Sequence, residues 1–215
     1  MSQQPILAYD CACVGASIAL STLAGITTRT IGQTAQAAEL IPAIDGLMKE
    51  ASIAYGALSA IVTTVGPGSF TGVRIGLAAL HGFVLVNNTP LKTLTTLEAM
   101  AWAVSLKPNA PQEFYTALRA GKGEIYAQKF NLLNSAPKAM NDITLHPETK
   151  TEWDAPLFSN HIDSADAHYI SGPDASVLCQ IADKLPTTSL SDALPIYIRP
   201  PDALPPAPLA WLQAN

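Results

Sequence analysis

The sequence has few charged residues, few aromatic residues and only three cysteines. Charged residues make up 13% and aromatic residues 7% of the 215 residues, whereas hydrophobic residues reach 48%. This composition excludes a chain that is disordered throughout, because it supplies a substantial core. It also leaves much of the surface weakly polar, which a partner or a dimer would explain, although the alanine content alone could produce it. The odd, low cysteine count excludes a disulfide framework.

Basic residues are scarce as well. The 12 Lys and Arg residues are outnumbered by 17 Asp and Glu, which gives a net charge of −5 and a pI of about 5.2. A protein that binds RNA by itself carries a basic face, because phosphate contacts supply most of the affinity. Any contact with RNA is therefore expected to be indirect, through a partner.

The chain also lacks a long uninterrupted hydrophobic segment. Its longest apolar run, from Val73 to Val86, contains Arg74 and His81 and is shorter than the roughly 20 residues that a bilayer requires. The N-terminal Met-Ser-Gln-Gln-Pro shows no basic region followed by an apolar run, so no signal peptide is expected. Together with the cysteine count, these features predict a cytoplasmic protein with no membrane partner.

The first half of the chain shows alternating strand and helix patterns. The patterns predict three antiparallel strands, a helix with Pro42 in its first turn, and then strands alternating with helices. The expected strands are Ile6–Asp10, Ala16–Leu20, Ile26–Thr30, Leu58–Val65 and Pro90–Leu94, and the expected helices are Leu40–Ala51, Thr71–Val86 and Thr96–Val104. This β-β-β-α-β-α-β-α order is that of the ribonuclease-H-like unit of actin-like folds.

A Lys-Pro-Asn-Ala-Pro segment at residues 107–111 marks the expected boundary between two lobes. We expect an N-terminal lobe at 1–106, a smaller C-terminal lobe at 107–194, and a proline-rich tail at 195–215 without regular structure. The second lobe should contain a hairpin of Phe114–Leu118 and Glu124–Asn131, a strand at Tyr169–Ser171 and a helix at Ala175–Lys184. Residues 134–164 show no clear pattern.

The most distinctive segment is Gly66-Pro-Gly-Ser-Phe-Thr-Gly-Val-Arg-Ile-Gly76. Its glycines permit a tight turn and close backbone approach, and the N–H groups at the start of the next helix would favour an anion. Two interpretations stay open, a working or remnant nucleotide-phosphate loop and a turn that serves helix packing. Asp10 likewise could face a nucleotide's metal or accept turn N–H groups. The candidate loop residues are Asp10, Gly66, Gly68, Ser69 and Thr71.

Other catalytic motifs do not fit this segment. No lysine follows Gly72, as a Walker A loop requires, and Thr71 stands where the dinucleotide-binding pattern needs glycine. The hydrolase elbow needs glycines two residues on either side of Ser69, where Pro67 and Thr71 stand. Elsewhere, Cys11 and Cys13 are too few for a metal site and are expected to be semi-buried thiols. The histidines form no His-x-x-x-His pair, and no nucleophile–base set is recognisable.

Small residues line the helix after the glycine turn. They are Gly72, Gly76, Ala79 and Gly82. A glycine in a helix interior costs about 1 kcal/mol relative to alanine. Close approach of another helix, either within the fold or across a subunit contact, would offset this cost.

The segment from Gly66 to Gly76 resembles the signature of the accessory-subunit family of tRNA threonylcarbamoyladenosine biosynthesis, the TsaB or YeaZ family. Five further segments resemble that family, whereas residues 132–168 match nothing. The five are Ile6–Asp10, Glu39–Glu50, Thr95–Ala101, Arg119–Tyr126 and Pro195–Asp202. The resemblance implies an α/β actin-like ATPase (ASKHA, ribonuclease-H-like) fold of two lobes, the second degenerate.

The resemblance also implies a function without catalysis. A member of this family is a scaffold or activator subunit that docks a TsaD-like threonylcarbamoyl transferase subunit and a small TsaE-like P-loop ATPase. It forms a homodimer through the N-terminal lobe when that partner is absent, and it meets tRNA only indirectly. No metal and no cofactor are expected beyond weak or vestigial ATP binding. The contact face implied by the resemblance comprises Leu40, Ile44, Leu47, Met48, Phe70, Gly72, Val73, Gly76, Ala79, Leu80 and Phe83.

The sequence departs from the family pattern at three places. Cys11-Ala-Cys13 stands where the family has Thr or Ser, Gln36-Ala-Ala38 where it has His-Ser-Glu, and Arg119 where it has Asp. Together the changes thin out the family's polar groups around the nucleotide cleft that the fold implies, which argues against ATP binding. The alternatives are a nucleotide-using actin-like enzyme, such as a small kinase or ATPase, and a peptidase.

Overall fold

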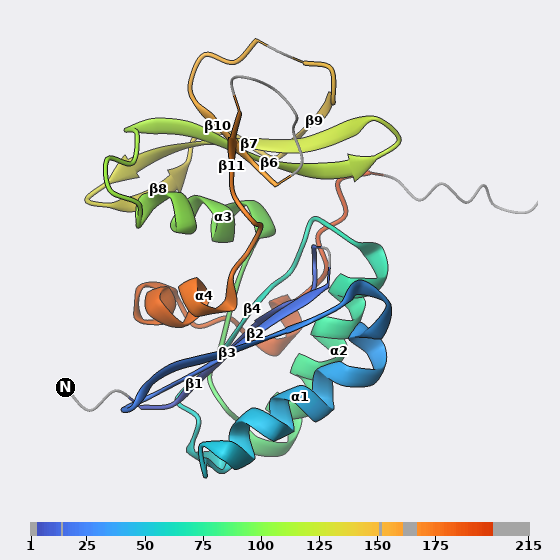
Figure 1. The fold of residues 1–215 in the computed structure, drawn as a ribbon, viewed down its shortest axis with the longest axis vertical. Coiled ribbons are helices and arrows are strands. Elements are labelled where there is room, and N and C mark those ends of the chain that lie inside the picture. The colour runs from blue at the N-terminus through green and yellow to red at the C-terminus, as the bar shows by residue number, and fades with distance from the viewer. Residues whose placement is uncertain (1–3, 14, 151, 161–166, 200–215) are drawn as a thin grey trace, which may run out of the picture.

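Two β-sheets form the framework of the molecule, with helices between them and on one outer side (Figure 1). The computed structural model describes residues 4–13, 15–150, 152–160 and 167–199. From the bottom of the view upward, the layers are α1 with α2, the first sheet, α4, α3 and the second sheet. Short 3₁₀ turns lie at Gln33–Ala35, Tyr55–Ala57, Ala182–Lys184 and Leu190–Asp192.

The first sheet has the strand order β3-β2-β1-β4-β5. Its first three strands are antiparallel, and β4 and β5 continue it in parallel from β1. The predicted strands are confirmed, with shifts of a few residues at their ends. Their bounds are Ile6–Asp10 for β1, Ala16–Thr22 for β2, Gly25–Ile31 for β3, Ala60–Thr64 for β4 and Leu91–Leu94 for β5.

Helices cover both faces of the first sheet. The helices α1 (Gln36–Glu50) and α2 (Phe70–Asn87) pack on the face to which Leu7 and Tyr9 point. The helix α4 (Ala175–Ile181) packs on the face of Ile6 and Ala8. Because successive strand residues point to opposite faces, this double cover explains why every residue of β1 is buried.

Pro42 lies inside α1 rather than in its first turn, so that prediction is wrong. The helix begins at Gln36, because Gln36-Ala-Ala-Glu39 are good helix formers that extend it by more than a turn before the proline. Pro42 is exposed, so its ring points to solvent and the missing N–H weakens only the outer side of the helix.

The second sheet has the order β11-β10-β6-β7-β8, with β9 also pairing with β7. The predicted hairpin is confirmed as the long pair β6 and β7, and α3 (Thr96–Ser105) covers one face of this sheet. Thr95 and Glu98 form a capping box at the start of α3, in agreement with the predicted cap. The strand bounds are Glu113–Gly121 for β6, Glu124–Leu133 for β7, Ala136–Ala139 for β8, Thr144–Pro147 for β9, Leu157–Ser159 for β10 and Ala167–Tyr169 for β11.

The boundary predicted at residue 107 does not separate the two lobes. The helix α4, placed in the C-terminal lobe by that boundary, packs with Leu178 and Ile181 against the first sheet. The helix α3, placed in the N-terminal lobe, packs with Leu97 and Met100 against the second sheet. The two helices therefore exchange lobes. The helix α3 packs on the second sheet, which follows it in sequence, whereas α4 returns to the first sheet after the second sheet is complete.

The segment after residue 193 connects the two lobes. The N–H of Ile196 donates to the carbonyl of Val65 at 2.8 Å, and Ile196 packs on the first core. Ile198 packs on the second core, and Arg199 forms an ion pair with Glu124. We call residues 194–199 the strap. It has no regular structure, as predicted, while residues 200–215 of the predicted tail lie outside the described residues.

Candidate functional site

The glycine loop is filled by the protein's own backbone. A Cβ atom on Gly68 would lie 2.1 Å from the carbonyl oxygen of Ala12, and one on Gly72 would lie 1.9 Å from that of Cys11. The N–H of Ser69 donates to the Ala12 oxygen at 2.6 Å. The turn after β1 therefore packs directly on the loop and on the start of α2, and this contact alone requires glycine at both positions.

Buried polar side chains hold this turn in place. Gln36 of α1 donates from Nε2 to the carbonyl of Cys11 at 3.3 Å and also to that of Gly15. Asp10 is buried and accepts hydrogen bonds from the Thr64 hydroxyl and from the backbone of Ala12 and Cys13. These contacts support the turn interpretation of Asp10.

Burial decides the protonation of Asp10. Desolvation raises the pKa of its carboxyl from 3.8 to about 6, although the hydrogen bonds from Thr64, Ala12 and Cys13 act in the opposite direction. Cys11 is buried and Cys13 partly buried, and desolvation raises the pKa of both thiols. Both thiols stay protonated and weakly nucleophilic at neutral pH, as expected of semi-buried cysteines.

The second lobe closes on the same turn. The Cys13 sulfur lies 3.3 Å from the position that a Cβ on Gly172 would take, and Asn160 Nδ2 lies 3.7 Å from that sulfur. Among the described residues, no group of three or more His, Cys, Asp and Glu side chains could hold a metal ion. Of the predicted loop residues, Asp10, Gly68 and Ser69 contact this turn, and Ser69 also caps α2 by accepting from the N–H of Gly72. Gly66 contacts Ile196 and Val73 instead, and Thr71 is exposed.

The predicted contact face requires correction. Eight of its eleven residues are buried within the monomer and, except for Leu40, which also lines the surface groove between α1 and α2, they serve the core rather than a contact face. The buried eight are Leu40, Ile44, Leu47, Met48, Gly72, Val73, Gly76 and Leu80, whereas Phe70, Ala79 and Phe83 reach the surface. The reason is physical, since a helix on a sheet turns its strongest apolar stripe inward.

The outer side of α2 is also apolar. The helix has a mean hydropathy of 1.4 over 18 residues, and only 28% of it is buried. By length and composition alone it could cross a membrane, a test that core helices of soluble proteins also pass. The inner side of α2 packs on the first sheet, and the outer side exposes Phe70, Leu85 and Val86.

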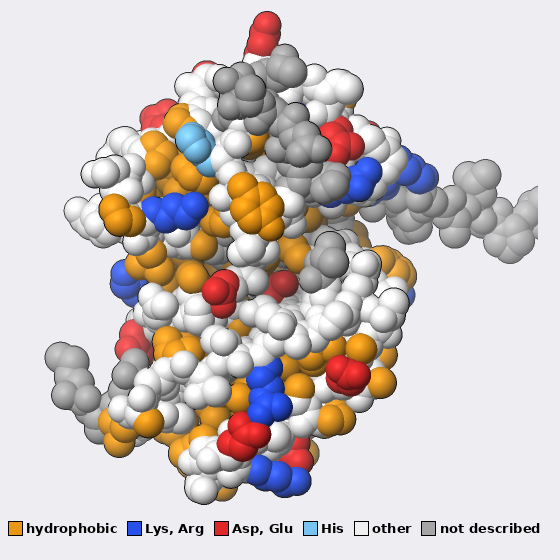
Figure 2. All heavy atoms as spheres, viewed as in Figure 1, with side chains coloured by type: hydrophobic (Ala, Val, Ile, Leu, Met, Phe, Trp, Pro, Cys, Tyr) orange, Lys and Arg blue, Asp and Glu red, His pale blue; other side chains and the backbone are white. Residues whose placement is uncertain are grey.

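A shallow apolar groove lies between the outer sides of α1 and α2. It has a volume of about 430 Å³. Figure 2 shows hydrophobic side chains at the surface over these two helices. The ring of Phe83, which lines the groove, stacks on the ring of Tyr55 with 5.2 Å between the ring centres. The lining residues are Ala37, Leu40, Ile41, Ile75, Ala78, Ala79, Gly82 and Phe83.

The glycines of α2 differ in what they contact. Gly72 and Gly76 meet the turn after β1 and the Tyr9 and Cys11 side chains, so packing within the chain accounts for them. A Cβ on Gly82 would meet nothing within 4 Å. Gly82 lines the groove, so its small size serves no packing role among the described residues of the chain itself.

Sequence reasoning missed the groove residues Ala37, Ile41, Ile75 and Ala78. A signal for them was present, because α1 and α2 each carry apolar residues beyond the stripe that one sheet can cover. Ile41, for example, is 46% exposed beside the buried Leu40.

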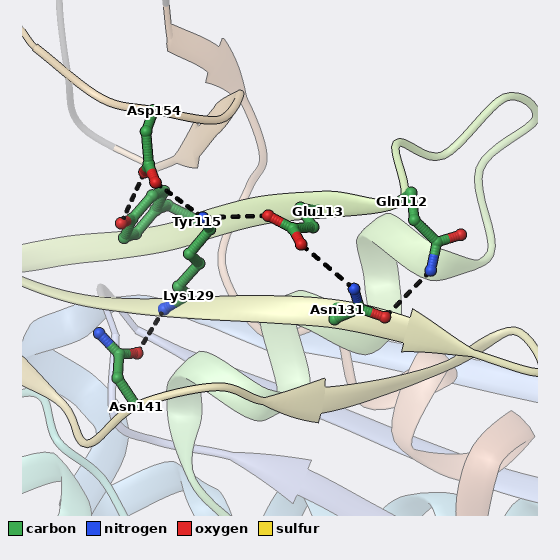
Figure 3. A network of polar contacts seen from close by, with 7 residues as sticks. All are labelled: Gln112, Glu113, Tyr115, Lys129, Asn131, Asn141 and Asp154. Atoms are coloured by element: carbon green, nitrogen blue, oxygen red, sulfur yellow. Dashed lines mark hydrogen bonds and ion pairs between the residues drawn. The ribbon is translucent and has the colours of Figure 1, made fainter.

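A second polar cluster lies on the second sheet, opposite α3 (Figure 3). Lys129 of β7 contacts Asp154 at 2.8 Å and Glu113 at 3.0 Å, and the Tyr115 hydroxyl donates to Asp154 at 2.9 Å. Hydrogen bonds to the two carboxylates raise the pKa of Lys129, and the bond from Lys129 lowers the pKa of Asp154. Lys129 thus bridges Glu113 of β6 and Asp154 of the loop before β10, and the cluster ties that loop to the sheet.

A sequence model of the family described as TsaD, tRNA N6-adenosine threonylcarbamoyltransferase, matches residues 28–183, more than half of the chain. The chain belongs to the TsaD family. Its sequence and structural relatives place it with the TsaB (YeaZ) proteins of that family. The α/β actin-like fold of two lobes is thereby established.

Three relatives illustrate the similarity. The Haemophilus influenzae threonylcarbamoyladenosine biosynthesis protein TsaB is 27% identical over 59% of this chain and 53% of its own length. The Escherichia coli TsaB is 31% identical over 40% of this chain and 37% of its own. The YeaZ structure from Pseudomonas aeruginosa superposes with a TM-score of 0.74 at 22% identity, covering 91% of this chain and 100% of that one. The chain thus spans about half or less of the length of these curated sequence relatives.

Proposed function

We propose that this protein is a non-catalytic scaffold or activator subunit in the formation of threonylcarbamoyladenosine in tRNA. Its partner is a TsaD-like threonylcarbamoyl transferase subunit, a paralogue of the same fold, and a small TsaE-like P-loop ATPase joins the pair. In the absence of the transferase subunit, two copies associate through the same face. Relatives named for this biosynthesis support the pathway, and the acidic net charge supports an indirect role toward tRNA.

One observation supports docking above all, namely the apolar groove between α1 and α2. Ile41 is 46% exposed in the groove, and Phe70 is 55% exposed near the start of α2. Contiguous exposed apolar surface of this kind marks interaction sites. Gly82 adds to this argument. Its helix-propensity cost of about 1 kcal/mol is not offset by any close contact that the structure describes. A partner helix that approaches the backbone at Gly82 would offset it.

We further propose that nucleotide binding by this chain is weak or lost. The glycines that would cradle a phosphate are already in contact with the carbonyl groups of Cys11 and Ala12. Asp10, the carboxylate that would face a metal, is used by Thr64 and by the backbone of the turn. The turn after β1 therefore takes the space beside Gly68 and Gly72 that a phosphate would need.

The docking proposal is tested by the variant Ala78→Glu, which places a charge on an exposed residue of the groove. Light scattering of the protein mixed with the transferase subunit should detect a complex for the wild type and none for this variant. The matched control is Ala24→Glu, at an exposed turn between β2 and β3, which should bind as the wild type does. Unimpaired binding by Ala78→Glu would show that the groove is not the docking face.

Nucleotide binding is tested by calorimetry of the isolated protein with ATP and Mg²⁺. The proposal expects little or no heat at protein concentrations suited to micromolar affinities. A micromolar affinity would revive the alternative of a small actin-like kinase or ATPase.

A further inference from the structure

One arginine of the chain is held between two aromatic rings at the surface. The guanidinium carbon of Arg74 lies 3.6 Å from the ring centre of Phe70 and 5.7 Å from that of Tyr197. Its Nε donates a hydrogen bond to the Tyr197 hydroxyl at 2.9 Å. The two rings are 5.5 Å apart. We call Phe70, Arg74 and Tyr197 the Arg74 clamp.

The clamp continues the apolar groove. Phe70, Arg74 and Ala78 are spaced by four residues along α2, so they lie on one side of the helix, and Ala78 lines the groove. Phe70 and Tyr197 are 55% and 48% exposed. Tyr197 belongs to the strap, so the surface around the groove is built from more than the two helices.

Arg74 differs from the other three arginines of the chain in its partners. Arg29 pairs with Glu50, Arg119 with Glu148 and Arg199 with Glu124. In the described part of the chain, Arg74 has no carboxylate partner, and its bonded partner is a neutral hydroxyl. Only Nε is used in that bond, so the two terminal amino groups keep their donors.

We propose that the Arg74 clamp binds a carboxylate side chain of the protein that docks in the groove. The proposal rests on the proposed function and adds the chemistry of one contact to it. A guanidinium presents a rigid fork that matches a carboxylate with two parallel hydrogen bonds. Stacking on Phe70 and the bond to Tyr197 fix that fork before binding, which lowers the entropy lost on association. The occupant is an acidic residue on the docking surface of the transferase subunit.

The affinity of the transferase subunit for clamp variants tests this proposal. Arg74→Ala should weaken binding about 10- to 100-fold, and Arg74→Lys should weaken it several-fold, because lysine keeps the charge but loses the fork. Tyr197→Phe keeps the ring and removes the hydroxyl that orients Arg74, so it should weaken binding about threefold. The matched control Arg29→Ala removes an arginine from an exposed ion pair outside the groove and should bind as the wild type does.

A charge exchange identifies the carboxylate itself. Arg74→Glu should abolish binding, and replacing one acidic residue on the transferase subunit with arginine should restore it. Failure of every such exchange would overturn the carboxylate assignment. Loss of self-association in Arg74→Ala with unchanged affinity for the transferase subunit would also overturn it, in favour of a second copy.

The outcomes separate this proposal from the proposed function. If Ala78→Glu abolishes binding and Arg74→Ala does not, docking stands and the clamp is wrong. If the wild-type protein shows no complex at all, the proposed function fails first. Thermal unfolding of each variant confirms that a loss of binding does not come from a loss of fold.

Discussion

Asp10 illustrates at the scale of one residue how a site can keep its side chain and change its role. In the structure its carboxyl group is buried, and it accepts hydrogen bonds from the turn that fills the glycine loop. The sequence placed Asp10 at the end of a strand but could not choose between a metal-facing and a turn-holding carboxylate. That choice depends on Thr64, on a neighbouring strand 54 residues away, which no local pattern connects to Asp10.

The buried Asp10 predicts a dependence of stability on pH. Its pKa is raised by desolvation from 3.8 to about 6, so the folded state holds a proton that the unfolded state releases between these values. The contribution of Asp10 to stability is therefore complete below about pH 4 and is lost as the pH rises through about 6. A rise of this size corresponds to on the order of 3 kcal/mol.

Urea unfolding of the wild type and of Asp10→Asn, from pH 4 to 8, measures this contribution. The difference in unfolding free energy between the two proteins should change between about pH 4 and about pH 7 and be constant above that range. Asp142→Asn, at an exposed loop position, serves as the control and should follow the wild-type curve. A constant difference between wild type and Asp10→Asn over the whole range would mean that Asp10 ionises normally in the fold.

At the scale of an element, α2 has two sides with opposite uses of glycine. Its inner side needs Gly72, since a Cβ there would lie 1.9 Å from the Cys11 oxygen, and its outer side leaves Gly82 in open space. Gly72→Ala should therefore lower the unfolding free energy by about 2–3 kcal/mol through overpacking. Gly82→Ala should raise it by up to about 1 kcal/mol through helix propensity.

Urea unfolding of these two variants of one helix compares the same substitution in two environments. The change in unfolding free energy should be negative for Gly72→Ala and positive for Gly82→Ala. Changes of the same sign would show that the two sides of α2 are assigned wrongly. In the docking assay, Gly82→Leu should weaken the complex while leaving the monomer folded, because its side chain would occupy the groove.

Periodicity predicted the existence of α1 and α2 correctly, but not the side that each presents to solvent. Both helices have more apolar positions than one sheet can cover, and a stripe such as Leu40, Ile44 and Leu47 fits a core as well as an interface. On each helix, the side with more apolar residues packs on the sheet. The remaining apolar residues, which include Ile41 and Ala78, line the groove. Which stripe is fuller depends on the sheet, so a helix pattern alone could not decide it.

At the scale of the whole molecule, the strands β1 to β5 and the β6–β7 hairpin followed from alternation and glycine placement. The strands β8 to β10 did not, because they have only three or four residues and rely on pairing with long neighbours. The exchange of α3 and α4 between the lobes was not predictable either. Packing of Trp102 and Leu178 in one cluster joins residues that are far apart in sequence, and no composition change marks it.

The strap predicts how the two lobes depend on each other. It bonds to Val65 beside the first sheet, packs Ile198 in the second core and pairs Arg199 with Glu124 at the β6–β7 hairpin. A chain that ends at Leu194 should be less stable than one that ends at Arg199 by about 2–5 kcal/mol, since it loses two partly buried isoleucines and these polar contacts. Urea unfolding of the two truncated chains measures the difference.

Hydrogen exchange locates the effect of the strap. In the chain that ends at Leu194, amides of β6 and β7 and of the loop before α2 should exchange faster, because the strap contacts both regions. Arg199→Ala in the longer chain should affect only the hairpin, where Arg199 bonds to Glu124 and to the Gly121 carbonyl. Equal stability and exchange in both truncated chains would mean that the lobes are joined by α3 and α4 alone.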